Sequence, residues 1–191
     1  MKFYIEVTLL PALDVPLYFL WEKIYSQVHL SLVEMQDAEG QVSIGVAFPG
    51  YDASKFQLGS KLRLFADDKA HFGRLDLGKW LHRFSDYVHL TSIRDVPAKC
   101  DYALFRRLQP KSSNARLARR KAKRQGITVA QAMQLLNGRK EQMGNVPFIW
   151  CKSLSSDKRY RLMIESVQAE QIQSGRFSTY GLSSSSTVPV F

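Results

Sequence analysis

The order of apolar and polar residues divides the first part of the chain into alternating strands and helices. Residues 2–10 are rich in Phe, Tyr, Ile and Val and stop at Pro11, which is typical of a strand. From Pro16 to Val33, apolar residues recur at helical spacing. The predicted elements that follow are strands at 42–48 and 61–65, a helix at 67–84 and a strand at 87–93. Gly73 and Gly78 lower the helix propensity of the segment 67–84. This βαββαβ order predicts a ferredoxin-like domain over residues 1–96.

Two further helices are predicted after Pro97, where the pattern changes. Residues 115–125 are strong helix formers, and Gly126 would end this helix. The segment Thr128-Val129-Ala130-Gln131 matches a capping box, in which a threonine and a glutamine three residues later satisfy the first backbone N–H groups of a helix. Asn137-Gly138 would terminate this second helix.

The last part of the chain returns to strand-like segments at 146–152 and 160–165. The tail at 175–191 is rich in Gly and Ser but carries six large apolar side chains, so we expect it to be packed rather than free. We therefore predict an α+β protein in which the ferredoxin-like domain is followed by a smaller α+β domain over residues 97–191.

Positive charge is concentrated in one segment. The chain has 27 Lys and Arg against 17 Asp and Glu, a formal net charge of +10. Residues 102–140 contain eleven of the basic residues and no acidic one, so the rest of the chain is close to neutral. Such a segment indicates a polyanionic partner. Nucleic acid is favoured over a membrane, because the segment has no run of Leu, Phe or Trp for insertion and no apolar run approaches the ~20 residues of a membrane span.

Within this segment, five cations share one face of the helix predicted at 115–125. They occupy positions i, i+3, i+4, i+7 and i+8 and are Arg116, Arg119, Arg120, Lys123 and Arg124. The alternative is an ordinary solvated surface, which explains most charge runs. Because no acidic residue lies nearby to relieve the mutual repulsion, we favour a face that binds phosphates.

Other candidate residues carry weaker signals when they are taken one by one. Arg107 and Gln109 have side chains suited to guanine and adenine edges, but the same residues also suit a polar linker. His29 lies in the first predicted helix, where a lone histidine is more often structural than catalytic. Ser153 follows a predicted strand, and Tyr180 lies in a glycine-containing turn.

No metal site or exported location is predicted. Cys100 and Cys151 lack CxxC spacing and are accompanied by four scattered histidines, so a zinc site is not expected. Glu6 and Pro11 interrupt any signal-peptide core, which predicts a cytoplasmic protein. Spacing alone leaves a disulfide open, although the cytoplasm would keep both thiols reduced.

The segments together resemble the type I-F CRISPR endoribonucleases, which cut precursor CRISPR RNA at each repeat hairpin. The resemblance covers nearly the whole chain, and the matching segments follow the family's order. They are His29 on its helix, Ile44-Gly45-Val46-Ala47-Phe48-Pro49, Arg107-Leu108-Gln109 with Lys111-Ser112, the arginine-rich helix, Lys152-Ser153, Tyr160-Arg161-Leu162 and Phe177-Ser178-Thr179-Tyr180-Gly181-Leu182-Ser183.

The resemblance implies a role for each matching residue. His29 would act on the ribose 2′-hydroxyl, Ser153 would hold that ribose, and Tyr180 would orient the histidine. Tyr160 takes the place of an aromatic residue that stacks on the terminal base pair. The remaining RNA-binding positions are Arg107 and Gln109, which would read purines, Lys111, Ser112, and the major-groove helix with Arg116, Arg119, Arg120, Lys123 and Arg124. Two features depart from the family pattern: Lys123 replaces an arginine, which turns a bidentate contact into a point charge, and Ser112-Ser113-Asn114 alters the helix start.

The implied reaction needs neither metal nor cofactor, because RNA supplies its own nucleophile. The products would be a 2′,3′-cyclic phosphate and a 5′-hydroxyl. The implied partners are the CRISPR repeat stem-loop and the type I-F surveillance complex, with no membrane. Two alternatives stay open. One is a non-catalytic hairpin RNA-binding subunit. The other is a single-strand RNA module that would use Phe3, Tyr4, Phe48 and Tyr87 on a sheet face.

Overall fold

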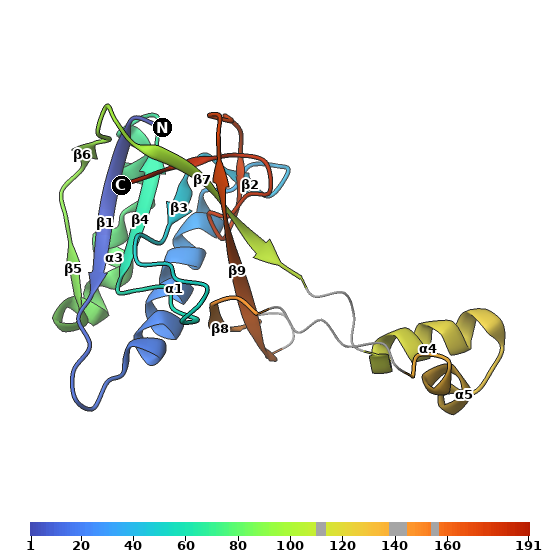
Figure 1. Ribbon diagram of the computed structural model, residues 1–191. Helices are drawn as coiled ribbons and strands as arrows, with labels where there is room; N and C mark the ends of the chain where they lie inside the picture. The colour runs from blue at the N-terminus through green and yellow to red at the C-terminus, as the bar shows by residue number, and fades with distance from the viewer. Residues whose placement is uncertain (110–113, 138–144, 154–156) are drawn as a thin grey trace. The chain divides into compact units, whose positions relative to one another are not determined.

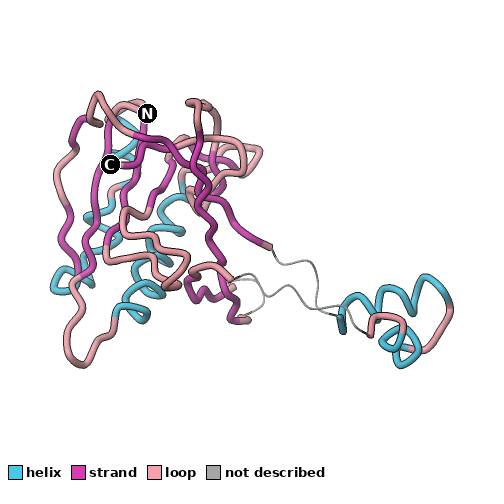
Figure 2. Tube along the Cα trace, viewed as in Figure 1, coloured by secondary structure: helices cyan, strands magenta, loops and turns pink. Residues whose placement is uncertain are grey.

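The computed structural model describes residues 1–109, 114–137, 145–153 and 157–191 (Figure 1). The chain forms two compact units, one of Met1–Arg107 with Val146–Phe191 and one of Leu108–Asn145. The boundary expected between residues 96 and 97 lies inside the first unit, because elements on both sides of it share one buried core. Helices and strands are mixed in the first unit, as predicted, and the second unit holds two helices (Figure 2).

The larger sheet of the first unit has antiparallel neighbours throughout. Its strands are β1 (Phe3–Leu9), β3 (Gly45–Ala47), β4 (Lys61–Ala66), β5 (Val88–Leu90) and β6 (Arg94–Asp95). They lie in the order β3-β4-β1-β5, and β6 pairs with the first residues of β1. The central strands β1 and β4 confirm the strands predicted at 2–10 and 61–65.

Four helical segments accompany this sheet. They are α1 (Leu17–Glu34), α2 (Ala70–Leu75), α3 (Leu77–Leu81) and the 3-10 helix η1 (His82–Tyr87). Val7, Leu62 and Leu64 of the sheet and Ile24 and Val28 of α1 are completely buried in one core. Full burial of such a side chain contributes roughly 1.5–3 kcal/mol, so this apolar face of α1 is what fixes the helix in place.

Two predicted elements are divided in the structure. The strand expected at 42–48 consists of β2 (Gln41–Val42), which pairs with β10 (Phe177–Ser178), and β3, which pairs with β4. The helix expected at 67–84 is broken at Asp76. This residue has a left-handed backbone (φ 43°), which ends α2, and its side chain accepts a hydrogen bond from the Lys79 N–H at the start of α3.

A second sheet completes the first unit. Its order is β11-β7-β9-β8, with β7 (Asp101–Leu108), β8 (Phe148–Lys152), β9 (Arg159–Ala169) and β11 (Val188–Val190). Strand β7 was not identified in the sequence. Ala103 and Phe105 alternate inward along β7, but two arginines at its end give the segment a polar composition.

The tail packs on the core, as predicted. Phe177 and Val188 are 2% and 1% exposed. Both side chains cover Gly45 on β3, where a Cβ atom would lie 2.6 Å from Cγ1 of Val188. Glycine at this position therefore allows the tail to approach the sheet closely.

The second unit is a pair of helices, α4 (Asn114–Gln125) and α5 (Val129–Gln134). α4 ends at Gly126, which has a left-handed backbone with φ 64°. The predicted capping box is confirmed: the Gln131 N–H donates to the Thr128 hydroxyl oxygen at 3.2 Å, and the Thr128 N–H donates to Gln131 Oε1 at 2.9 Å. The core between the helices consists of three small side chains, Ala118, Ala122 and Ala132.

Candidate active site and nucleic-acid interface

His29 lies on α1, and its ring is held on two sides. Nδ1 is 2.8 Å from the carbonyl oxygen of Thr179. The imidazole stacks on the ring of Tyr180, with centroids 4.1 Å apart and planes 5° apart. A carbonyl oxygen can only accept, so Nδ1 carries the proton of this hydrogen bond and the neutral ring keeps its lone pair on Nε2. Burial lowers the pKa of His29 below 6.5, and the bond to Thr179 opposes part of this effect.

Tyr180 is presented by a tight turn of the tail. The Gly181 N–H donates to the Ser178 carbonyl at 2.7 Å, and the Ser178 N–H donates to the Leu182 carbonyl at 2.9 Å. Gly181 has a left-handed backbone with φ 68°, and a Cβ atom there would lie 2.4 Å from Cγ1 of Val46. Both observations require glycine at this position, so the turn that places Tyr180 depends on it.

Tyr160 and Arg107 lie against Tyr180. The hydroxyl oxygens of Tyr160 and Tyr180 are 2.5 Å apart. The guanidinium of Arg107, at the exposed end of β7, lies 5.5 Å from the ring centroid of Tyr160 and 5.7 Å from that of Tyr180. These are cation–π distances. The structure therefore brings together four predicted site residues: His29, Tyr180, Tyr160 and Arg107.

Ser153 lies one residue after β8, in the hairpin that leads to β9. Its N–H donates to the Lys158 carbonyl at 2.9 Å, and its carbonyl accepts from the Asp157 N–H at 2.9 Å. Two residues earlier in the same hairpin, Cys151 pairs in register with Tyr160. The hairpin thus carries both Ser153 and the tyrosine next to Tyr180, while the role of Ser153 toward a ribose stays a prediction.

Two residues at this site were missed by sequence reasoning. The hydroxyl of Tyr25 donates to the Tyr180 carbonyl at 2.8 Å, and burial raises its pKa. Burial also raises the pKa of the Cys151 thiol to about 11, against the opposing effects of the Tyr160 hydroxyl and the Arg107 charge. Both side chains resemble ordinary core residues in the sequence. The one signal in the sequence was the position of Tyr25, four residues before His29 on the same helix.

The predicted cationic face is present on α4. All five of its cations are exposed, and Ala118 and Ala122 are buried on the opposite side of the helix. Among the described residues, none of the five forms an ion pair with a carboxylate. The face therefore presents uncompensated positive charge, which suits a polyanion.

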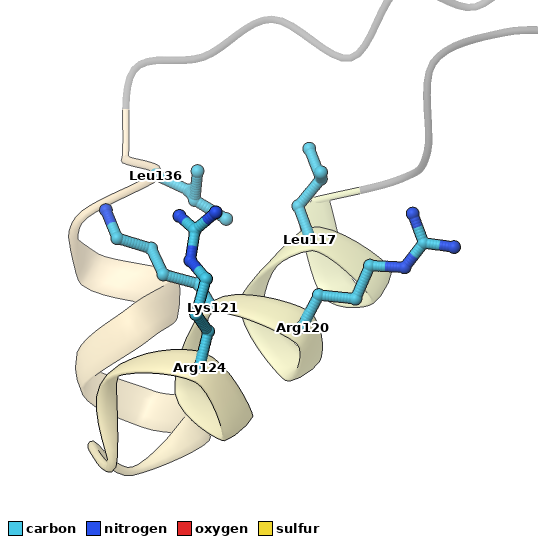
Figure 3. A pocket seen from close by; sticks show the side chains of 5 residues that line it. All are labelled: Leu117, Arg120, Lys121, Arg124 and Leu136. Atoms are coloured by element: carbon cyan, nitrogen blue, oxygen red, sulfur yellow. The ribbon is translucent and has the colours of Figure 1, made fainter.

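A groove of about 600 Å³ runs beside this face (Figure 3). Its lining residues are Leu117, Arg120, Lys121, Arg124 and Leu136. Figure 3 shows the side chains of Lys121 and Arg124 reaching toward Leu136, while Arg120 extends away from them. Lys121 was not among the predicted phosphate ligands, and it widens the cationic surface beyond the five predicted residues.

The remaining predicted RNA contacts lie at the start of the second unit. Gln109 is exposed and follows β7 directly. Lys111 and Ser112 lie outside the described residues. Base reading by Gln109 and Arg107 stays a prediction.

Two of the four aromatic residues named for a single-strand RNA module are buried. Tyr4 is 9% exposed and contacts Phe191 edge-to-face, with centroids 5.1 Å apart. Phe48 is 1% exposed within the core. Bases could not stack on these two rings, which counts against that alternative.

Neither a metal cluster nor a membrane helix is present in the ranges that the structure describes. Within them, no three side chains of His, Cys, Asp or Glu gather closely enough to hold a metal ion. None of the helices found there combines the length and the apolar composition needed to cross a bilayer.

A protein-family model described as "CRISPR-associated protein (Cas_Csy4)" matches residues 4–191. The chain belongs to this family. Two curated relatives are both named CRISPR-associated endonuclease Cas6/Csy4, and each match covers 100% of this chain and 100% of the relative. The relative from Escherichia coli (strain UTI89 / UPEC) is 32% identical over 193 residues. The relative from Pseudomonas aeruginosa (strain UCBPP-PA14) is 31% identical over 198 residues. These matches confirm the resemblance to type I-F CRISPR endoribonucleases.

Solved structures show a more distant similarity to this Cas_Csy4 member. One is described as "Characterization of a Cas6-related gene from Pyrococcus furiosus", with a TM-score of 0.37 and 12% identity over 100% of this chain and 99% of that chain. Another is described as "An RAMP protein binding different RNA substrates", with a TM-score of 0.38 and 14% identity over 99% of this chain and 100% of that chain.

Proposed function

We propose that this Cas_Csy4 protein is a CRISPR RNA-processing endoribonuclease. It would bind the repeat hairpin of precursor CRISPR RNA and cut at the base of the stem, leaving a 2′,3′-cyclic phosphate and a 5′-hydroxyl. The observation that carries the proposal is the imidazole of His29, stacked on Tyr180 with Nδ1 bound to the Thr179 carbonyl. Family membership and the names of the two relatives support the same function.

In the proposed reaction, Nε2 of His29 takes the proton of the ribose 2′-hydroxyl beside the scissile phosphate. The 2′-oxygen forms a bond to phosphorus as the bond from phosphorus to the 5′-oxygen breaks, and the leaving 5′-oxygen takes a proton from water. The RNA provides the nucleophile, so no metal-activated water and no cofactor are needed. The lowered pKa keeps His29 neutral near pH 7, which a base requires.

The neighbouring residues would position the reacting groups. Tyr180 would keep the imidazole in one orientation, and Ser153 would hold the ribose whose 2′-oxygen attacks. In-line attack requires this alignment before the bond can form, so each residue would act on rate rather than on affinity. Tyr160 would stack on the terminal base pair of the stem.

The RNA grip would come mainly from the second unit. The exposed cations of α4 would contact phosphates in the major groove near the end of the hairpin stem, where that groove is accessible. Arg107 and Gln109 would read purines at the base of the stem. Lys111 and Ser112 would add contacts before the helix. Binding through this many positive charges favours retention of the product. We propose that the protein remains bound to its RNA in the type I-F surveillance complex.

The proposal also includes the architecture and the location of the protein. Residues 1–96 would form a ferredoxin-like domain, which the antiparallel order β3-β4-β1-β5 supports. Residues 97–191 would form the RNA-binding α+β part of the chain, which contributes strands to the first unit and the helices α4 and α5 to the second. An enzyme that acts on newly transcribed RNA would work in the cytoplasm.

The decisive experiment compares cutting with binding on one labelled repeat hairpin. His29→Ala should slow single-turnover cleavage by about 10²–10⁴, the usual contribution of a positioned acid–base group, while affinity stays within a few-fold. A hairpin that lacks only the 2′-hydroxyl upstream of the scissile phosphate should bind and not be cut. EDTA should change neither result.

Matched controls separate the possible outcomes. His82→Ala removes an exposed histidine of the same unit and should leave both cutting and binding unchanged. If the 2′-deoxy hairpin is still cut, or if EDTA stops the reaction, water is the nucleophile and the role of His29 is wrong. If the unmodified hairpin binds but is never cut, the protein is the non-catalytic RNA-binding subunit.

A further inference from the structure

Tyr160 lies between the residues proposed to cut RNA and the one proposed to read it. Its hydroxyl is 2.5 Å from the hydroxyl of Tyr180, the ring on which His29 stacks. Its own ring lies 5.5 Å from the guanidinium of Arg107. Tyr160 also pairs in register with Cys151 on the neighbouring strand. Tyr160 therefore contacts both groups from a regular β-hairpin.

We propose that Tyr160 is a positioning residue: its hydroxyl holds the Tyr180 ring against His29, and its ring holds the Arg107 guanidinium beside them. This inference rests on the proposed function, because it concerns how the side chains of the same proposed active site are held in position. It assigns Tyr160 a role in the RNA-free protein, separate from stacking on a base pair.

The contacts of Tyr180 explain why a second tyrosine is needed. The turn at Gly181 and the hydrogen bond from Tyr25 fix only the main chain of Tyr180. The direction of its ring depends on contacts made by the ring itself. Among the described residues, Tyr160 is the hydrogen-bond partner of the Tyr180 hydroxyl, at the far end of that ring. Without this partner the ring could turn away, and His29 would lose its stacking surface and part of its burial.

The first test needs no RNA. The protein is labelled with isotopes at histidine, and the titration of His29 is followed by NMR. The His29 signal is identified as the one that is missing from the spectrum of His29→Gln. Two groups contact the imidazole of His29, namely the Thr179 carbonyl and the phenol of Tyr180. The charged guanidinium of Arg107 lies beside that phenol. Tyr160→Phe should raise the pKa of His29 toward 6.5, because water would reach the imidazole.

The matched control is Tyr51→Phe. The Tyr51 hydroxyl donates to the Ile164 carbonyl at 3.2 Å, so this variant also removes one tyrosine hydroxyl that binds β9. The control should leave the titration of His29 unchanged. An unchanged titration in Tyr160→Phe as well would overturn the inference.

The second test measures cleavage and affinity on the repeat hairpin. Tyr160→Phe should slow single-turnover cleavage about threefold to tenfold, the worth of one neutral hydrogen bond, with affinity within twofold because the ring and its contact with Arg107 remain. Tyr160→Leu removes the ring too and should also weaken binding. Lost affinity with an unchanged rate in Tyr160→Phe would overturn the inference. If the unaltered protein does not cut the hairpin, the proposed function fails, while the RNA-free titration still decides whether Tyr160 holds Tyr180.

Discussion

The turn at Gly181 allows a quantitative test of how tightly the tail holds the candidate site. Gly181→Ala adds one methyl group where φ is 68°, and the new Cβ would lie 2.4 Å from Cγ1 of Val46, which is completely buried. A left-handed backbone costs a residue other than glycine ~1–2 kcal/mol. An extra methyl group in a packed core costs ~1–3 kcal/mol more. We therefore expect the free energy of unfolding to fall by about 2–5 kcal/mol.

Urea denaturation followed by tryptophan fluorescence measures this loss, because Trp21, Trp80 and Trp150 all belong to the first unit. Gly40→Ala is the matched control for the backbone cost. Gly40 has φ 72° in the same unit, and the nearest atom to the methyl group added there, Oε1 of a flexible glutamine, would be 3.7 Å away. This control should lose only ~1–2 kcal/mol.

A double variant isolates the steric part of the loss. Val46→Ala removes the atom that the new methyl group meets. Gly181→Ala and Val46→Ala together should therefore cost about 1–3 kcal/mol less than the sum of the two single variants. If the two losses simply add, within ~0.5 kcal/mol, the contact with Val46 does not limit this turn. A loss no larger than that of Gly40→Ala would refute the steric argument as a whole.

Three further predictions follow from other parts of the molecule. Replacing Arg119 and Arg120 by Ala should weaken hairpin binding and flatten its dependence on salt by roughly 0.7–0.9 in log–log slope per lost phosphate contact; an unchanged slope would mean that α4 is only a solvated surface. Arg107→Ala should cost about 1–3 kcal/mol of affinity on the cognate stem and less on a stem altered at the contacted base pair, whereas equal losses would indicate a backbone contact. The single-turnover cleavage rate should rise with pH and level off with a midpoint below 6.5, because only the neutral ring of His29 accepts a proton and burial lowers its pKa; a midpoint above 6.5 would contradict this reasoning.

The parts of the fold that follow local rules could be predicted from the sequence. Strand β1 and helix α1 have clear periodicity and are bounded by Pro11 and Pro16, and the capping box at Thr128 fixes the start of α5. Strand β7 escaped prediction because its arginines obscure the alternation of its buried residues. The break at Asp76 was also missed, since a left-handed backbone at an aspartate leaves little trace in a sequence.

The candidate site was less predictable, because its residues meet only in the folded chain. His29 and Thr179 are 150 residues apart, and no local pattern pairs them. The family resemblance paired His29 with Tyr180, whereas the bond to the Thr179 carbonyl was not predicted. The face of cations on α4, in contrast, follows from helical spacing alone. The contact of Tyr160 with Tyr180 joins β9 to a turn of the tail 20 residues later, and no local pattern pairs the two side chains.

The late position of the tail has a consequence for the order of synthesis. A ribosome adding ~5–20 residues per second needs roughly 8–30 s for the 150 residues between His29 and Thr179. During that interval, the growing chain acquires the cationic helix α4 before it has Tyr180 or the carbonyl that fixes the imidazole. The nascent protein can therefore attract RNA before its proposed active site is assembled. The turn that carries Thr179 and Tyr180, which is made after α4, would decide when binding can lead to cutting.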